Sequence, residues 1–447
     1  KDVNRLVANV YWGQLSNYLS VPTDCPQRNE RLGWTADTQV FAETGSFFAN
    51  TDSFLHKWMR DMRDTQSPLG GYPGVAPVAQ YGASSKNMMR LGWADAGVIV
   101  PWTVWKQFGD TSIIEENWEA MEKFMDHVAE TGYDHETLVS ENGNSQWADW
   151  LSYEPLETRS GQAFDYDKNG KKSVKPDALE YWNYLSACYW IIDASMMKDM
   201  AVATGKDAAK YEKMVAQVKA DTKSRFLNAD GTFKCAVFNT MQTPALFALK
   251  NGLVDGEAKE SLCARLRANF AEHDGCLQTG FLGTSILMAT LTENDMTDIA
   301  YDLLFQRKNP SWLYSIDNGA TTIWERWNSY TLENGMGPKD MNSFNHYAYG
   351  AVCQWLWETV AGISAVEPGF SRISLKPVPD IRLGGIDAEF DSPSGLIRSS
   401  WHYDHATDGT VVWTFTTPVT ADVWFPNAET PAEYTPGTYT VKLNVND

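Results

Sequence analysis

Eight stretches of this chain repeat their apolar residues at the spacing of an α-helix, and this repetition limits the possible folds more than any other feature. Short links rich in Gly, Asp and Asn separate the repeats, and no β-α-β alternation is present. The pattern predicts helices over residues 3–19, 38–62, 114–129, 176–200, 208–226, 243–250, 257–272 and 286–303. Helix after helix with short connections predicts helical hairpins arranged in a ring.

The pattern changes after residue 364. Apolar residues alternate at period two over residues 368–379, 395–403, 411–415, 421–425 and 439–443, as in β-strands. We therefore expect a helical domain over residues 1–364 and a small antiparallel, sandwich-like β domain over residues 365–447. Trp401, Trp413 and Trp424 occur at strand spacing and are expected in the core of the β domain.

Composition excludes several classes of partner. A formal charge of −20 argues against nucleic acid and anionic membranes, and favours a neutral substrate over a polyanionic one. No apolar run approaches the ~20 residues of a membrane span. The six cysteines are scattered without metal-ligand spacing, so we expect free thiols and neither a metal nor a cofactor. The nineteen tryptophans suit a helical core and also a cleft that stacks sugars.

Residues 24–37 read DCPQRNERLGWTAD and crowd charges around one indole. A core segment could not bury so many charges without pairing them. Carboxylates and guanidinium groups bind hydroxyls in pairs, and an indole covers an apolar sugar face, which favours a carbohydrate pocket. A structural ion-pair network between two helices is the alternative.

A second acid lies between aromatic rings at residues 321–327, TTIWERW. Glu325 stands between Trp324 and Arg326, a setting that suits a general base. A buried Glu–Arg pair is an equally good interpretation of these residues alone. His346 follows in SFNHYAYG, and a single histidine is more often structural than catalytic.

Three further motifs have two interpretations each. Asp149 lies between Trp147 and Trp150 in QWADWL, where it could cap a helix or face a ligand. The string DYDKNG at residues 165–170 copies half a calcium loop, but Pro176 replaces the final Glu, so we predict a surface turn without calcium. Residues 278–284, QTGFLGT, are too rich in glycine for a helix interior.

Together these motifs resemble the inverting α-L-rhamnosidases, a family of glycoside hydrolases with an (α/α)6 barrel. The matching strings are DCPQRNERLGWTAD, the Trp-Glu-Arg-Trp of residues 324–327 and QTGFLGT, so the resemblance covers nearly all of the helical region. It implies that Glu30 is the general acid and that Glu325 activates water as the general base. The substrate-binding residues that we expect are Asp24, Arg28, Trp34, Asp37, Trp93, Trp147, Trp150, Trp324 and His346.

The resemblance implies a hydrolase that releases terminal α-L-rhamnose and inverts the anomeric configuration. Its substrates would be rhamnose-containing oligosaccharides, polysaccharides or glycosides, and it would need neither metal nor cofactor. Family members usually carry β domains ahead of the barrel, and we expect this chain to lack them. The sequence does not indicate the cellular compartment of the protein. Two alternatives remain: another (α/α)6 glycosidase or lyase with a different glycone, and a carbohydrate-binding protein without turnover.

Overall fold

The structure, a computed structural model, describes residues 1–447 except 79–89, 132–146, 340, 405–408 and 446–447. It divides into two compact units. The first comprises Lys1–Ala42, Phe54–Trp102 and Ile114–Ala351, and the second comprises Glu43–Ser53, Thr103–Ile113 and Val352–Asp447.

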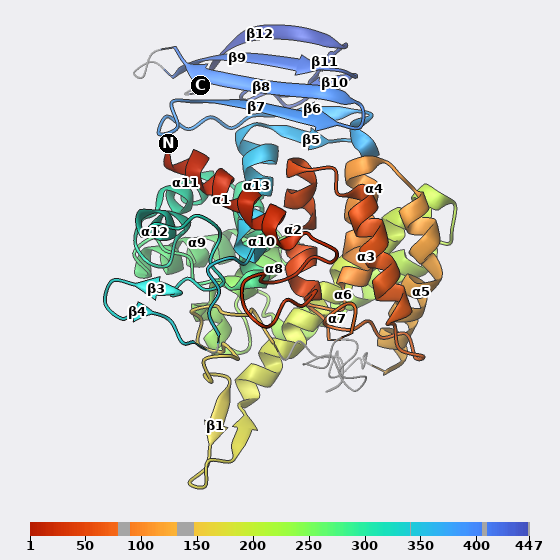
Figure 1. Cartoon of the computed structure of the whole chain (residues 1–447), viewed down its shortest axis with the longest axis vertical. Coiled ribbons are helices and arrows are strands. Elements are labelled where there is room, and N and C mark those ends of the chain that lie inside the picture. Colours follow the sequence, from red (N-terminus) through yellow and green to blue (C-terminus); the bar gives the residue numbers. More distant parts are fainter. Residues whose placement is uncertain (79–89, 132–146, 340, 405–408, 446–447) are drawn as a thin grey trace. The chain divides into compact units, whose positions relative to one another are not determined.

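Helices dominate the first unit (Figure 1). Four of the described helices are shared with the second unit: α2 and α4 end in it, and α3 and α5 begin in it. The α-helices are α1 (Asp2–Asn17), α2 (Thr35–Phe48), α3 (Asp52–Asp64), α4 (Ala96–Phe108), α5 (Ser112–Thr131), α6 (Pro176–Thr204), α7 (Ala209–Phe226), α8 (Gln242–Lys250), α9 (Gly256–Glu272), α10 (Phe281–Glu293), α11 (Thr297–Phe305), α12 (Trp312–Asp317) and α13 (Val352–Trp355). Shorter helical turns are η1 (Ala236–Thr240), η2 (Ala348–Ala351), η3 (Leu356–Val360) and η4 (Pro368–Phe370).

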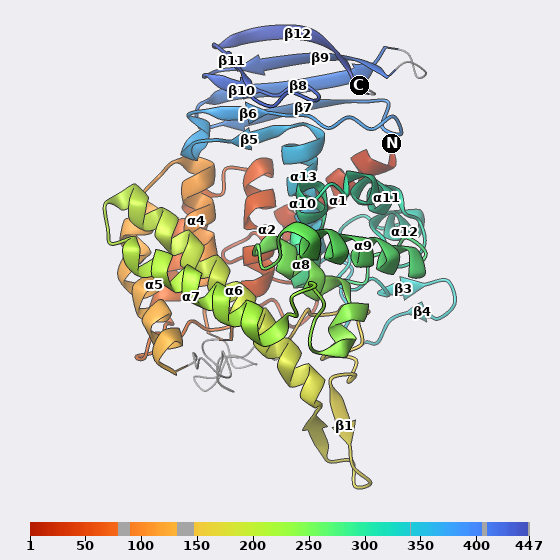
Figure 2. The ribbon, with the colours of Figure 1, turned by 180° about the vertical axis from the view of Figure 1, so that it is seen from behind.

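The burial patterns explain why these segments are helical. Helix α3 buries Leu55, Trp58, Met59 and Met62, which recur at the spacing of one helix face. Helix α6 starts with Pro176 in its first turn, ends at Gly205 with a φ of 67°, and is buried over most of its length. Helix α7 lies beside α6, and α8 contacts both α9 and α10 (Figures 1 and 2). The helical region forms the (α/α)6 barrel that the family resemblance implies.

Two predicted helices are each divided in two. Residues 38–62 contain most of α2 and most of α3, separated where Asn50 Oδ1 accepts a hydrogen bond from the Asp52 amide at 3.2 Å. Residues 286–303 contain parts of α10 and α11, with Asp295 between them at a φ of 57°. Residues 278–284 were expected to lie outside a helix. This is wrong for residues 281–284, because α10 begins at Phe281.

The strands form two small hairpins in the first unit and two four-stranded sheets in the second. The hairpins are β1 (Phe164–Tyr166) with β2 (Lys172–Val174), and β3 (Tyr330–Thr331) with β4 (Gly335–Met336). The sheets have the orders β11-β10-β6-β5 and β12-β9-β8-β7. Their strands are β5 (Ile363–Ala365), β6 (Ile373–Leu375), β7 (Gly385–Ser392), β8 (Gly395–Tyr403), β9 (Thr410–Thr417), β10 (Ala421–Val423), β11 (Ala432–Tyr434) and β12 (Gly437–Asn444). The pair β6–β10 is parallel and the other pairs are antiparallel.

The sheets confirm part of the predicted β core. Trp401 and Trp413 lie opposite each other on β8 and β9, and both are fully buried. Trp424 is only half-buried, with Lys376 Nζ 5.0 Å from its ring centroid, so its assignment to the core is wrong. An indole packed against a lysine stem at a sheet margin needs no full burial.

Three other expectations concern small features. The DYDKNG string turns between β1 and β2, where Asp167 Oδ1 accepts hydrogen bonds from the amides of Asn169 and Lys171, both at 2.8 Å. This confirms the surface turn. All six cysteines are free thiols, as expected. Within the described part of the chain, no helix has both the length and the apolar character needed to cross a membrane.

Candidate active site

The charged stretch of residues 24–37 forms a closed loop between α1 and α2. Asp24 and Leu32 close it, because the Asp24 amide donates to the Leu32 carbonyl at 2.8 Å and the Leu32 amide donates to Asp24 Oδ1 at 2.9 Å. At the tip of the loop, Glu30 Oε1 accepts a 2.8 Å hydrogen bond from Trp34 Nε1. The loop therefore fixes the Glu30 carboxylate against an indole edge.

Gly33 allows this loop to lie against the next segment of the chain. A Cβ atom at Gly33 would lie 2.2 Å from the Ala76 carbonyl oxygen. That carbonyl also accepts a 2.9 Å hydrogen bond from Trp58 Nε1, and the Ala76 amide donates to the Gly33 carbonyl at 2.9 Å. Any other residue would push the loop away from α3, so the glycine has a steric role here.

The second half of the site comes from two segments late in the chain. The Glu325 amide donates to the Ser343 carbonyl at 2.9 Å, and the His346 amide donates to the Ile323 carbonyl at 2.8 Å. These bonds hold Glu325 and His346 side by side. Gln27 Nε2 donates to Ser343 Oγ at 2.7 Å and ties this pair to the first loop.

Arg28 connects the two glutamates. Its Nη2 atom lies 2.7 Å from Glu30 Oε2 and 3.4 Å from each carboxylate oxygen of Glu325. The bridged oxygens of the two glutamates are therefore no farther apart than the sum of these distances. Glu325 is only 2% exposed, whereas Glu30 is 22% exposed. One glutamate is thus enclosed by protein and the other lies nearer to solvent.

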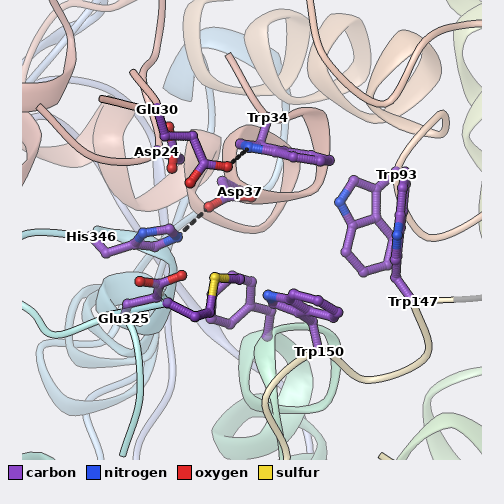
Figure 3. Close-up of a pocket in the computed structure, with 11 residues that line it drawn as sticks. Asp24, Glu30, Trp34, Asp37, Trp93, Trp147, Trp150, Glu325 and His346 are labelled. Carbon is purple, nitrogen blue, oxygen red and sulfur yellow. Dashed lines mark hydrogen bonds and ion pairs between the residues drawn. The ribbon is translucent and has the colours of Figure 1, made fainter. Parts of the chain in front are cut away.

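His346 forms a buried ion pair with Asp37 on α2. Its Nε2 atom lies 2.6 Å from Asp37 Oδ1 (Figure 3). Burial opposes the charged imidazole, but the Asp37 carboxylate outweighs it and raises the pKa of His346 to about 9. Nδ1 of His346 is buried without a hydrogen-bond partner among the described residues. A charged imidazole with a free donor is suited to bind a ligand hydroxyl.

Asp24 has an unusual protonation state for a carboxyl group. Burial, together with the nearby Glu30 and Asp37 carboxylates, raises the pKa of Asp24 to about 7. Near neutral pH Asp24 is therefore partly ionised and partly protonated. The carboxylate form can accept a hydrogen bond from a polyol hydroxyl, and the protonated form can donate one.

Indole rings form the opposite side of the pocket (Figure 3). The ring centroid of Trp147 lies 5.6 Å from that of Trp34, edge to face, and 4.8 Å from that of Trp93. The pocket is lined by Asp24, Glu30, Trp34, Asp37, Trp93, Trp147, Trp150, Phe281, Glu325, Met341 and His346. Aromatic walls with a few converging polar groups are typical of small-ligand sites.

Most of the predicted site residues thus lie together, with two exceptions. Arg28 is outside the lining but contacts both glutamates. Trp324 does not line the pocket: its ring packs edge to face on Phe344, with centroids 5.2 Å apart, and borders a separate small cavity with Trp312 and Trp327. The expectation for Trp324 is corrected accordingly.

Phe281 and Met341 line the pocket and were missed. Phe281 belongs to the QTGFLGT string, so the motif was noticed but its role was not. Met341 has no motif around it, and no signal in the sequence could have found it.

Asp149 serves the fold and does not line the pocket. Its carboxylate accepts hydrogen bonds from the amides of Gly280, Leu282 and Gly283 at 2.7, 2.8 and 3.0 Å, at the start of α10. Thr243 Oγ1 donates a fourth hydrogen bond at 2.6 Å. The helix-cap interpretation is therefore correct, although the capped helix lies far away in the sequence.

One group of possible metal ligands lies in the pocket. The ligand atoms of Asp24, Cys25 and Glu30 are within 4.8 Å of one another. Burial raises the pKa of the Cys25 thiol, so it stays protonated and is a poor ligand. Glu30 is already held by Arg28 and Trp34. We assign no metal to these residues.

The Asp37–His346 pair predicts a change of stability with pH. The pKa of His346 is about 9 in the folded chain and about 6.5 when unfolded. The pair therefore stabilises the fold fully below pH 6.5, and we expect about 3 kcal/mol to be lost as pH rises through 9. Thermal unfolding at pH 6.5 and 9.5 measures it. Between these two pH values, His346→Gln should lose less stability than the wild type. The control His402→Gln, at an exposed position, should lose as much as the wild type. Equal losses in His346→Gln and the wild type would contradict the assignment.

Comparison with known families identifies this arrangement. Residues 1–360 match the family model described as the bacterial alpha-L-rhamnosidase 6 hairpin glycosidase domain. Residues 362–439 match the bacterial alpha-L-rhamnosidase C-terminal domain. The chain belongs to the bacterial α-L-rhamnosidase family. The pocket and the Asp149 cap of α10 therefore belong to the helical domain of this family.

Individual relatives agree with this assignment. An alpha-L-rhamnosidase of Formosa agariphila is 36% identical over 410 residues, which are 91% of this chain and 41% of that protein. One from Streptomyces avermitilis is 34% identical over 441 residues, covering 98% of this chain and 39% of that protein. The crystal structure of the Streptomyces avermitilis alpha-L-rhamnosidase complexed with L-rhamnose superposes with a TM-score of 0.87 at 30% identity, over 99% of this chain and 41% of that chain. The chain thus spans about two-fifths of the length of these rhamnosidases.

Proposed function

We propose that this chain hydrolyses terminal α-L-rhamnosides with inversion of the anomeric configuration. Family membership supports the reaction, and one observation carries the mechanism: Glu30 and Glu325, from distant parts of the chain, line one pocket and share Arg28. Two carboxyl groups facing one ring are the usual requirement for glycoside hydrolysis.

The exposure of the two glutamates distinguishes their roles. Glu30, at 22% exposed, lies on the more open side, where a departing aglycone can leave toward solvent. It would donate its proton to the glycosidic oxygen as the bond to C1 breaks. Glu325, at 2% exposed, would take a proton from a water molecule whose oxygen forms the new bond to C1.

The remaining residues would hold the rhamnosyl ring. Asp24, Arg28, Asp37 and His346 offer hydrogen bonds to its hydroxyls, and the charged imidazole adds a strong donor. The indoles Trp34, Trp93, Trp147 and Trp150 would cover its apolar face and the 6-deoxy methyl group. Burial of that methyl group is worth about 0.8 kcal/mol, which disfavours sugars with a hydroxyl there.

Inversion sets a condition on the geometry. Without a sugar, Arg28 holds the bridged oxygens of Glu30 and Glu325 no more than about 6.1 Å apart, the sum of its 2.7 and 3.4 Å contacts. Inverting glycosidases hold their carboxyl groups about 6.5–9.5 Å apart, so that water fits beside the ring. The 6.1 Å limit applies to one oxygen of each carboxylate, and the two carboxyl groups as a whole can lie farther apart, so the arrangement is compatible with an inverting site.

An NMR time course on an aryl α-L-rhamnoside tests the proposal. Inversion predicts that β-L-rhamnose is the anomer first released, before mutarotation. Release of the α anomer first would show retention and remove the proposed role of Glu325. Hydrolysis of only other glycosides in a nitrophenyl panel would reassign the glycone, and rhamnose binding without hydrolysis would leave a binding protein.

A further inference from the structure

Arg90 is a buried cation beside the indole wall, and no carboxylate among the described residues pairs with it. It is 8% exposed, and its Nε and Nη1 atoms are buried without a hydrogen-bond partner. Burial alone lowers the pKa of Arg90 to about 10, and no carboxylate among the described residues raises it again. The guanidinium is therefore still charged at neutral pH.

The contacts of Arg90 tie it to the pocket. Its guanidinium carbon lies 4.9 Å from the ring centroid of Trp147, which lines the pocket. Its carbonyl accepts hydrogen bonds from the amides of Trp93 and Ala94 at 3.1 and 2.8 Å, so Arg90 and Trp93 belong to one turn. The side chain thus lies against Trp147 at the indole wall, next to the residues that line the pocket.

The other two cations at the site are already neutralised. Arg28 contacts Glu30 and Glu325, and His346 contacts Asp37. Among the residues that the structure describes, the guanidinium of Arg90 contacts the face of Trp147 and no carboxylate. A cation–π contact offsets part of the cost of desolvating a guanidinium, but an uncompensated buried charge remains expensive. A fold that keeps such a charge next to a binding pocket leaves it available for an anion.

We infer that Arg90 recognises the carboxylate of a uronic acid in the substrate, on the sugar attached to the rhamnosyl group. The planar fork of a guanidinium matches a carboxylate in shape and charge. This inference rests on the proposed function and makes its substrate class more specific: acidic rhamnosides are preferred to neutral ones. The charge of −20 does not oppose it, because at physiological salt the field of distant acids is screened beyond about 8 Å.

The test compares two disaccharides that differ only in the charged group. They are α-L-rhamnosyl-(1→4)-D-glucuronate and its carboxyl-reduced counterpart, α-L-rhamnosyl-(1→4)-D-glucose. We expect the wild type to hydrolyse the acidic one with a kcat/KM at least about tenfold higher, and Arg90→Gln to remove this preference while keeping activity on the neutral one. Arg90→Lys, which keeps the charge, should retain part of the preference. The control Arg398→Gln, on exposed β8, should retain all of it.

Each other outcome has a distinct meaning. No hydrolysis of either disaccharide or of an aryl α-L-rhamnoside would overturn the proposed function itself. Hydrolysis with equal kcat/KM for the two disaccharides in the wild type would overturn the role of Arg90 alone. An equal loss on both substrates in Arg90→Gln would also overturn it, because Arg90 would then only support the Trp147 ring. The ratio of the two rates is unaffected by partial misfolding of a variant.

Discussion

Glu325→Gln is expected to lower kcat for α-L-rhamnoside hydrolysis by about 10²–10⁴-fold, because the water then lacks a group that takes its proton. The loss should be similar for aryl and alkyl rhamnosides, since Glu325 acts on the water and not on the leaving group. Steady-state kinetics on 4-nitrophenyl and methyl α-L-rhamnoside measure it. Glu333→Gln, in the exposed turn between β3 and β4, is the matched control and should keep full activity.

Glu30→Gln should lose a similar factor on the methyl rhamnoside but much less on the nitrophenyl rhamnoside. A nitrophenolate leaves without protonation, whereas an alkoxide does not. The dependence of the loss on the leaving group therefore distinguishes the general acid, Glu30, from the general base, Glu325. If Glu325→Gln showed the leaving-group dependence and Glu30→Gln did not, the two roles would be exchanged. If both variants kept wild-type rates, the hydrolytic mechanism would be wrong.

The sequence predicted the separate pieces of this site better than their assembly. Glu30 and Glu325 each lie among indoles and arginines within a few residues, so local composition drew attention to both stretches, and the resemblance to the α-L-rhamnosidases then singled out the two glutamates. Their shared contact with Arg28 depends on the fold and could not be predicted from spacing. The partner of His346 was likewise invisible, because Asp37 lies on α2, at the other end of the helical region.

The errors have a physical pattern. Trp324 was grouped with Glu325 because they are neighbours in the sequence, but the Trp324 ring packs on Phe344 and not in the pocket. Helix α10 was underestimated because its glycine-rich start seemed unable to begin a helix. The missing stabilisation comes from Asp149, and a cap supplied from a distant segment leaves no local signal.

This cap is the basis of the second large effect, on stability. Asp149→Ala removes the acceptor of four hydrogen bonds, from Thr243 Oγ1 and the amides of Gly280, Leu282 and Gly283, and leaves these donors buried. We expect the start of α10 to lose about 4 kcal/mol, since leaving buried groups without their charged partner costs about 3–5 kcal/mol. Hydrogen exchange of the three amides measures this locally, and thermal unfolding measures it globally. Asp149→Asn should lose an intermediate amount of stability, because its side-chain NH2 group would face N–H and O–H donors. The control Asp230→Ala removes an exposed turn aspartate that is hydrogen-bonded to Thr232, and it should leave both amide exchange and thermal unfolding unchanged. Unchanged exchange in Asp149→Ala would mean that α10 starts without this cap, and that its position beside the pocket depends on packing alone.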